Sequence, residues 1–293
     1  MIIPAWAIFG ITAAALSASM MLSQEKLRVN GYALAFWIKA ACVMVTAPFI
    51  IFHGVPTDPL FYLYLFLTAI IYAISDVLFF SGITKTDAGA VSRLIPSASV
   101  LSFLMWFAID PELFSIYMQS PAITGTIFGT LCLFAYFAFR LKKCTVTVKT
   151  LRAVWFVIVA ATIGPLFTKM TTFHAEKEIG IYSYVFFQAL MMMGLWFSYM
   201  CVRHPIPFSE FFEPKTVLKS LGIGVIASVM VLTKFTAFYF VDNPAYIPAV
   251  IALDSVMILF IYKLWGKQAE GDIRSGLGIV ACAALLIILK AQI

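Results

Sequence analysis

Charged residues are scarce in this sequence. Only 12% of the 293 residues are Asp, Glu, Lys or Arg, whereas 62% are hydrophobic and the mean hydropathy is +0.98. Soluble domains carry roughly a quarter charged residues, because their surfaces need polar groups to cover the apolar interior. The composition therefore excludes a water-soluble fold and indicates a protein whose solvent is lipid.

Cysteine and histidine are too few and too scattered to form a metal centre or a disulfide framework. The five cysteines include no CxxC pair, and His53, His174 and His204 stand alone in or beside predicted loops. A zinc site needs several converging ligands, and a disulfide framework needs regularly spaced cysteines. We therefore expect no metal, no cofactor and three solvated loop histidines.

Motifs of catalysis and of ATP hydrolysis are also missing. The sequence has no HExxH pair, no nucleophile elbow and no GxxxxGK[ST] loop. An enzyme needs a cluster of reactive groups, and ATP-driven transport needs the phosphate loop. The net charge of +6 does not indicate a nucleic-acid partner, because most basic residues lie in short loops beside apolar runs. These absences favour a protein that is not an enzyme.

Long apolar runs are what the sequence has instead. Each is near the ~20 residues that cross a bilayer, and each must be helical because lipid offers no partner to unpaired backbone groups. The first run, which no basic segment precedes, is expected to be a retained helix and not a signal peptide. The ten runs lie near residues 3–22, 32–53, 59–81, 88–109, 121–139, 152–171, 180–202, 216–240, 244–264 and 273–290. We predict an all-α, polytopic membrane protein with ten transmembrane helices.

A basic segment, residues 140–152, divides the chain into two halves of five runs each, residues 1–143 and 144–293. In each half, a segment that begins with Asp opens the fourth of the five runs. Lys39 in the second run of the chain corresponds to Gln188 in the seventh. Weak internal repeats of this kind are common in transporters. Because five is odd, the two repeats are expected to cross the membrane in opposite directions.

The distribution of lysine and arginine predicts the orientation. Fourteen of these residues lie in or beside the loops that follow odd-numbered runs, whereas Lys177 and Lys290 lie on the opposite side. Positive residues stay in the cytoplasm. Both termini are therefore expected outside the cytoplasm.

Three local patterns accompany the duplicated layout: FSGITKTDAGA at residues 80–90, DNPAY at residues 242–246 and FWIK at residues 36–39. Over nearly its whole length the chain resembles the EamA-like family of the drug/metabolite transporter superfamily. The family's Ser-Pro step in helices 4 and 9 reads Ala98-Ser99 and Asp254-Ser255 here.

The resemblance implies two EamA-like repeats in a carrier of a bacterial cytoplasmic (inner) membrane. Helices 1–4 and 6–9 would surround a central pathway, with helices 5 and 10 at the periphery. Many relatives place both termini in the cytoplasm, against the charge distribution of this chain.

Ionisable residues inside the runs are the candidates for function. A charge at a helix centre costs at least ~2.5–3.5 kcal/mol on insertion scales, so such residues usually face a cavity or a partner. We expect Lys169, near the end of its run, to reach the interface with its long side chain. The candidate substrate-binding residues are Lys39, Asp76, Arg93, Lys234 and Asp254.

Depth along the helices sorts these candidates into two groups. Asp76, Arg93 and Lys39 are expected at one level, where Asp76 and Arg93 either form a structural pair or line a vestibule in which Lys39 is an uncompensated cation. Lys234 and Asp254 are expected to form a looser group toward the outer side. There Asp254 is either paired silently with Lys234 or acts as a proton-coupling carboxylate, because burial disfavours its charged form.

The sequence favours a secondary transporter that moves a small metabolite with an anionic group by alternating access. A flippase for a lipid-linked substrate is the alternative on the same fold, and a lipid-modifying enzyme is less supported. Aromatic residues such as Trp106 and Phe238 are expected to face lipid and the interfaces. Gly125 and Gly129 form a GxxxG pattern, which either brings two copies together in a homodimer or occurs by chance.

Overall fold

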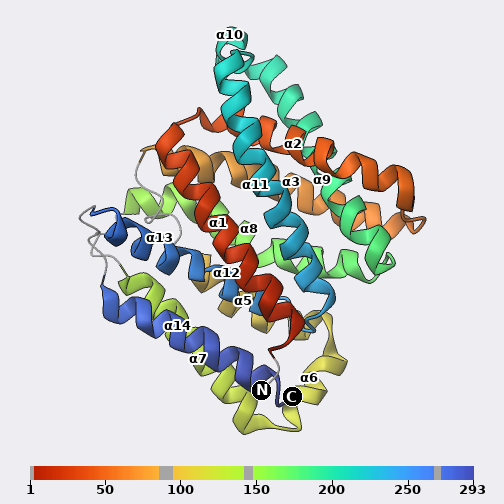
Figure 1. The fold of residues 1–293 in the computed structure, drawn as a ribbon. Helices are drawn as coiled ribbons and strands as arrows, with labels where there is room; N and C mark the ends of the chain where they lie inside the picture. Colours follow the sequence, from red (N-terminus) through yellow and green to blue (C-terminus); the bar gives the residue numbers. More distant parts are fainter. Residues whose placement is uncertain (1–2, 86–94, 142–147, 267–271) are drawn as a thin grey trace.

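The chain is built from helices. The computed structural model describes residues 3–85, 95–141, 148–266 and 272–293, and every regular element within them is an α-helix (Figure 1). The helices are α1 (Ala5–Leu27), α2 (Gly31–His53), α3 (Pro59–Lys85), α5 (Ile95–Ile109), α6 (Pro111–Met118), α7 (Pro121–Arg140), α8 (Val148–Thr172), α9 (Lys177–Arg203), α10 (Phe208–Phe211), α11 (Pro214–Tyr239), α12 (Tyr246–Ile251), α13 (Leu253–Leu264) and α14 (Ile273–Lys290).

The long helices are suited to a bilayer. In the described part of the chain, nine spans are long and apolar enough to cross a membrane, with α12 and α13 together forming one of them. The bent pair of α5 and α6, which turns by 108°, would supply a tenth. The chain is therefore a multi-pass membrane protein, and the predicted apolar runs agree with the observed helices to within a few residues. The predicted fourth run begins outside the described residues.

Helix α6 lies between the predicted fourth and fifth apolar runs, where the sequence analysis placed no helix. Asp110 caps α6 by accepting from the backbone N–H of Leu113, Pro111 occupies the first helical turn, and Glu112 follows it. Asp, Pro and Glu in this order are a helix-start signal, because proline needs no N–H there and acidic groups interact favourably with the helix N-terminus. The segment is too short to span a bilayer, so a search for apolar runs passes over it.

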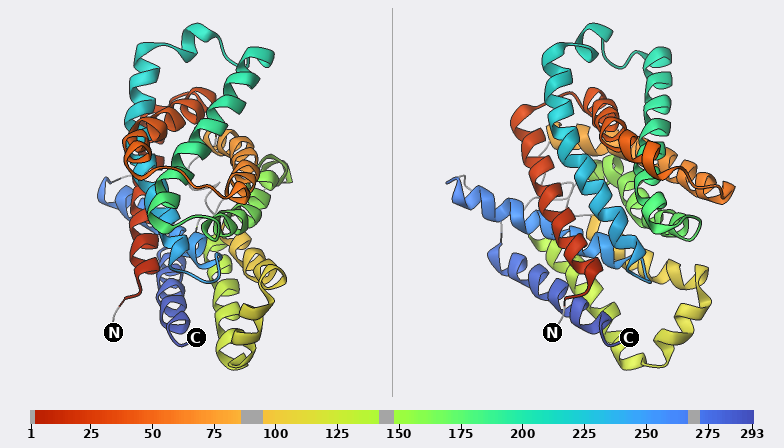
Figure 2. Two further views of the ribbon diagram at one scale, coloured as in Figure 1. Left: turned by 90° about the vertical axis from the view of Figure 1, so that its right-hand side faces the viewer. Right: turned by 45° about the vertical axis from the view of Figure 1, so that its right-hand side comes forward.

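Helices from the two halves of the chain pack against one another. Helix α1 lies on α11, α12 and α13, while α3 lies on α8 and α2 lies on both α9 and α11. Helices α7 and α14 pack side by side, away from the centre of the bundle (Figures 1 and 2). Because helices of the first half pack on helices of the second half, the centre of the molecule lies between helices from both halves.

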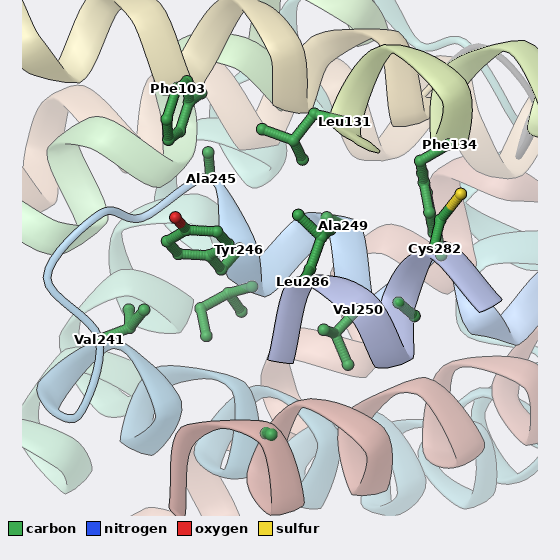
Figure 3. Close-up of a cluster of buried hydrophobic side chains, with 14 of the residues drawn as sticks. Phe103, Leu131, Phe134, Val241, Ala245, Tyr246, Ala249, Val250, Cys282 and Leu286 are labelled. Atoms are coloured by element: carbon green, nitrogen blue, oxygen red, sulfur yellow. The ribbon is translucent and has the colours of Figure 1, made fainter. Parts of the chain in front are cut away.

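Two large apolar clusters hold the described part of the bundle together. One joins α1, α2, α3, α9 and α11. The other joins α5, α7, α12 and α14, where Phe103 lies near Tyr246 of the short helix α12 and Phe134 lies beside Cys282 of α14 (Figure 3). Trp106 belongs to this second cluster and is fully buried, so the expectation that it faces lipid or an interface is wrong.

Both ends of the chain lie at the same end of the molecule, opposite α10 (Figure 1). Near the C-terminus, Lys290 Nζ is 2.7 Å from Asp242 Oδ2. This ion pair attaches the end of α14 to the turn that precedes α12.

Candidate functional site

A cavity of about 230 Å³ lies at the centre of the bundle. Its described lining residues come from α1, α2, α3, α8, α9, α11, α12 and α13, and none of them from α7 or α14. Four of the five sequence candidates line it: Lys39, Asp76, Lys234 and Asp254. The fifth, Arg93, lies outside the described residues. Four of the residues that were chosen because they are ionisable and lie inside apolar runs therefore line one common cavity.

Lys39 of α2 and Asp76 of α3 form an ion pair. The distance from Lys39 Nζ to Asp76 Oδ2 is 2.9 Å, and both side chains are largely buried. The expectation that Lys39 is an uncompensated cation is therefore wrong. Helix α2 packs on α3, so the two side chains meet from neighbouring helices. Depth along a helix predicts which residues share a level, but not which of them face each other.

Lys234 of α11 belongs with this pair and not with Asp254. Its Nζ lies 5.4 Å from the ring centroid of Tyr72, and its charge interacts with those of Asp76 and Lys39. No carboxylate among the described residues lies within the 4.0 Å limit of an ion pair with Lys234. The expected grouping of Lys234 with Asp254 is therefore wrong, and the cation without an ion-pair partner in the described cavity is Lys234.

Asp254 stands on a different wall of the cavity, directly after a break in the helix. Helix α12 ends at Ile251 and α13 begins at Leu253, so Asp254 is in the first turn of α13. One carboxylate oxygen accepts a 2.8 Å hydrogen bond from the Ser17 hydroxyl of α1, and the other accepts one of 3.1 Å from the Ser255 hydroxyl. The side chain is thus buried with hydroxyl partners.

An aromatic and hydroxyl wall completes the cavity. The rings of Tyr184 and Phe235 stack with centroids 3.8 Å apart. The Tyr184 hydroxyl accepts from Gln188 at 2.7 Å and lies 3.1 Å from the Thr168 hydroxyl. Phe238 also lines the cavity and is fully buried, so the expectation that it faces lipid or an interface is wrong. Sequence reasoning missed Tyr184 and Thr168, because nothing in their local pattern separates a cavity-facing hydroxyl from a helix-packing one.

Gly164 of α8 makes room for another part of this wall. A Cβ built at Gly164 would lie 2.5 Å from Cζ of the Tyr72 ring. Because Gly164 has no side chain, the phenol ring of Tyr72 can lie against the backbone of α8. Lys234 Nζ lies over this ring. The Tyr72 hydroxyl is buried and makes no hydrogen bond of good geometry, although Thr168 lies near it.

Two further sequence expectations are wrong. Lys169 does not extend to the interface, since it is buried and its Nζ donates a 2.9 Å hydrogen bond to the carbonyl of Phe238. His174 does not stand alone, since its Nδ1 lies 2.7 Å from Asp58 Oδ2 and joins the loop before α9 to the loop before α3. In each case the partner is distant in the sequence, which explains why local patterns did not reveal it.

The arrangement can bind a small polar molecule within an apolar enclosure. One wall offers the cation of Lys234 beside the Lys39–Asp76 pair, and another offers the carboxylate of Asp254. Within the described ranges, no three His, Cys, Asp or Glu residues come together as metal ligands.

Comparisons with known proteins found a similar fold but no matching family model and no matching curated protein. No protein-family model matches the chain, and no curated protein matches it at a significant level. Its fold is similar to that of a protein of known crystal structure, with a TM-score of 0.66 over 98% of both chains and 13% sequence identity. At this identity the likeness shows a shared fold and says nothing of a shared activity.

Proposed function

We propose that this protein is a secondary transporter that carries a small metabolite with an anionic group across the membrane by alternating access. The observation that carries the proposal is the central cavity, which charged residues from α2, α3, α11 and α13 line. Ionisable side chains inside a membrane domain are expensive to keep, and they commonly mark the path of a substrate or an ion.

The packing of the helices supports an inverted repeat. If the five spans of one half are matched in order to those of the other, the contact of α1 with α11 corresponds to that of α8 with α3. The contacts of α2 with α9 and of α7 with α14 then map onto themselves. Such a pattern is expected of two repeats related by a two-fold axis, and transporters place their substrate sites at the interface between such repeats.

The positions of the termini support ten crossings. Both ends of the chain lie at one end of the molecule (Figure 1), which agrees with an even number of crossings. Nine spans and the bent α5–α6 pair give ten when the pair is counted once. This layout agrees with the EamA-like resemblance of the sequence. That resemblance in turn implies a location in the bacterial inner membrane.

The cavity favours a small carried molecule over a lipid-linked one. Its volume of about 230 Å³ lies below the ~300–1,000 Å³ of pockets for drug-sized ligands. Lys234, which has no ion-pair partner among the described residues, is the group that would receive the anionic part of the substrate. Lys39, whose charge is paired with Asp76, would then influence the substrate indirectly through that ion pair.

A thermal-shift screen of the purified protein tests the proposal. Succinate, citrate, inorganic phosphate and sugar phosphates are compared with arginine and choline as cationic controls. We expect an anionic compound to raise the melting temperature and to be taken up by proteoliposomes that contain the protein.

The Lys234→Gln variant is expected to bind this compound roughly 10- to 150-fold more weakly, the range that follows from losing one charged hydrogen bond of ~1.5–3 kcal/mol. Lys177→Gln is the matched control, because Lys177 is exposed at the start of α9. A confirmed cationic substrate, or full affinity in Lys234→Gln, would contradict the proposal.

A further inference from the structure

Asp254 is the one carboxylate of the described cavity that has no cation beside it. Asp76 pairs with Lys39, whereas no lysine, arginine or histidine of the described residues lies within 4.0 Å of the Asp254 carboxylate. The Asp254 residue is only 7% exposed. Keeping an isolated carboxylate charged in such a place is costly, and the usual relief is to bind a proton.

The surroundings of Asp254 also support its charged form. Two hydroxyls, those of Ser17 and Ser255, donate to its two oxygens, and hydrogen bonds of this kind stabilise a carboxylate. Its place in the first turn of α13 adds the favourable field of a helix N-terminus. Burial and hydrogen bonding thus act in opposite directions on the charged form of Asp254.

The other titratable groups around Asp254 lie farther off. On α1, Glu25 lies two helical turns beyond Ser17 and accepts a hydrogen bond from Tyr262 of α13. On α14, which packs on α13, the titratable groups are Arg274, Cys282 and Lys290. Those lining the cavity from α2, α3, α9 and α11 are Lys39, Tyr72, Asp76, Tyr184 and Lys234.

We propose that Asp254 is a proton-binding site of the cavity and that the proton is the ion to which transport is coupled. A proton from water on one side of the membrane forms an O–H bond with one carboxylate oxygen. On the other side that bond breaks, the proton returns to water and the carboxylate is restored. The inference rests on the proposed transport function, since a coupling ion requires a transported substrate.

Ser17 couples the protonation of Asp254 to the contact between α1 and α13. When Asp254 is charged, the Ser17 hydroxyl donates to it across the contact between α1 and α13. When Asp254 is protonated, its O–H donates and the serine oxygen accepts. A serine in a helix can then direct its own proton to the carbonyl four residues earlier, here that of Ala13. Proton binding thereby reverses the hydrogen bond that joins α1 to the broken helix.

Infrared difference spectroscopy on the purified full-length protein tests this site without any substrate. Spectra at mildly acidic and mildly alkaline pH are compared in H₂O and in D₂O. We expect a carboxylic acid C=O band that appears at the acidic pH, shifts in D₂O and is absent from Asp254→Asn. Asp76→Asn, which removes the ion-paired carboxylate, is expected to retain the band. Ser17→Ala is expected to retain it to more alkaline pH, because the charged form loses a hydrogen-bond donor.

A wild-type protein without such a band overturns the inference, as does a band that survives in Asp254→Asn or disappears in Asp76→Asn. A sodium arm separates the proton from a metal cation. Exchanging potassium chloride for sodium chloride at constant ionic strength is expected to leave the melting temperature of the wild type unchanged. A rise in sodium that Asp254→Asn lacks would assign the site to sodium and overturn the inference. These measurements involve no transported compound, so their outcome is independent of the screen that tests the proposed function.

Discussion

Gly224 of α11 lies so close to Ala41 of α2 that a Cβ added to the glycine would be 2.5 Å from the Cβ of Ala41. The same Cβ would lie 3.1 Å from Cα of Ile38, a backbone atom that no side-chain rotation can move. Because α2 carries Lys39 and α11 carries Lys234, this contact fixes how closely two cation-bearing helices approach each other.

The Gly224→Ala variant is therefore expected to be less stable. Adding a methyl group to a tightly packed contact costs ~1–3 kcal/mol, which a lowered melting temperature in detergent would reveal. Gly222→Ala is the matched control in the same helix, because a Cβ at Gly222 meets nothing within 4 Å. Alanine there is expected to be neutral or to stabilise by ~0.5–1 kcal/mol. Equal stability of the two variants would show that α11 moves freely away from α2.

The Lys39–Asp76 pair predicts a non-additive pair of variants. Removing one partner of a buried ion pair costs ~3–5 kcal/mol, and we expect less here because the Asp76 side chain is 24% exposed. Lys39→Gln and Asp76→Asn should each lower the melting temperature, while the double variant should recover most of the loss. Additive losses in the double variant would mean that each residue is held by other contacts.

The Asp58–His174 contact predicts a dependence of stability on pH. The Leu60 backbone N–H and the His174 ring hold the pKa of the Asp58 carboxyl below its usual range. The stabilisation is therefore complete above the ordinary carboxyl pKa of ~3.9 and is lost as the pH falls through the lower value of the folded protein. Melting temperatures along an acid titration are expected to fall less steeply in Asp58→Asn than in the wild type. Parallel curves would show that the contact does not contribute.

The orientation of the chain is also open to a direct test. The basic residues predict termini outside the cytoplasm. A C-terminal fluorescent protein that matures only in the cytoplasm is expected to stay dark, and an alkaline phosphatase fusion, active only outside, is expected to be active. The opposite pair of results would place both termini in the cytoplasm.

Sequence reasoning predicted the helices and the cavity residues better than it predicted contacts. Lipid forces each long apolar run to be a helix, so run length alone located the spans. The cost of burying charge then identified Lys39, Asp76, Lys234 and Asp254, all of which line the cavity. Partners such as Lys39 with Asp76, or Ser17 with Asp254, depend on how each helix is rotated and which helix lies beside it. Those relations are set by packing between distant segments, and no short stretch of sequence encodes them.

The packing of α1 has a consequence for how the protein is made. Its main partner, α11, begins at Pro214, so it leaves the ribosome roughly 190 residues after α1 is complete, or roughly 10–40 s later at 5–20 residues per second. During that interval α1 lacks α11, and Ser17 lacks Asp254, the residue to which it donates in the complete protein. The contacts between α1 and α11 can therefore form only after synthesis of most of the second half.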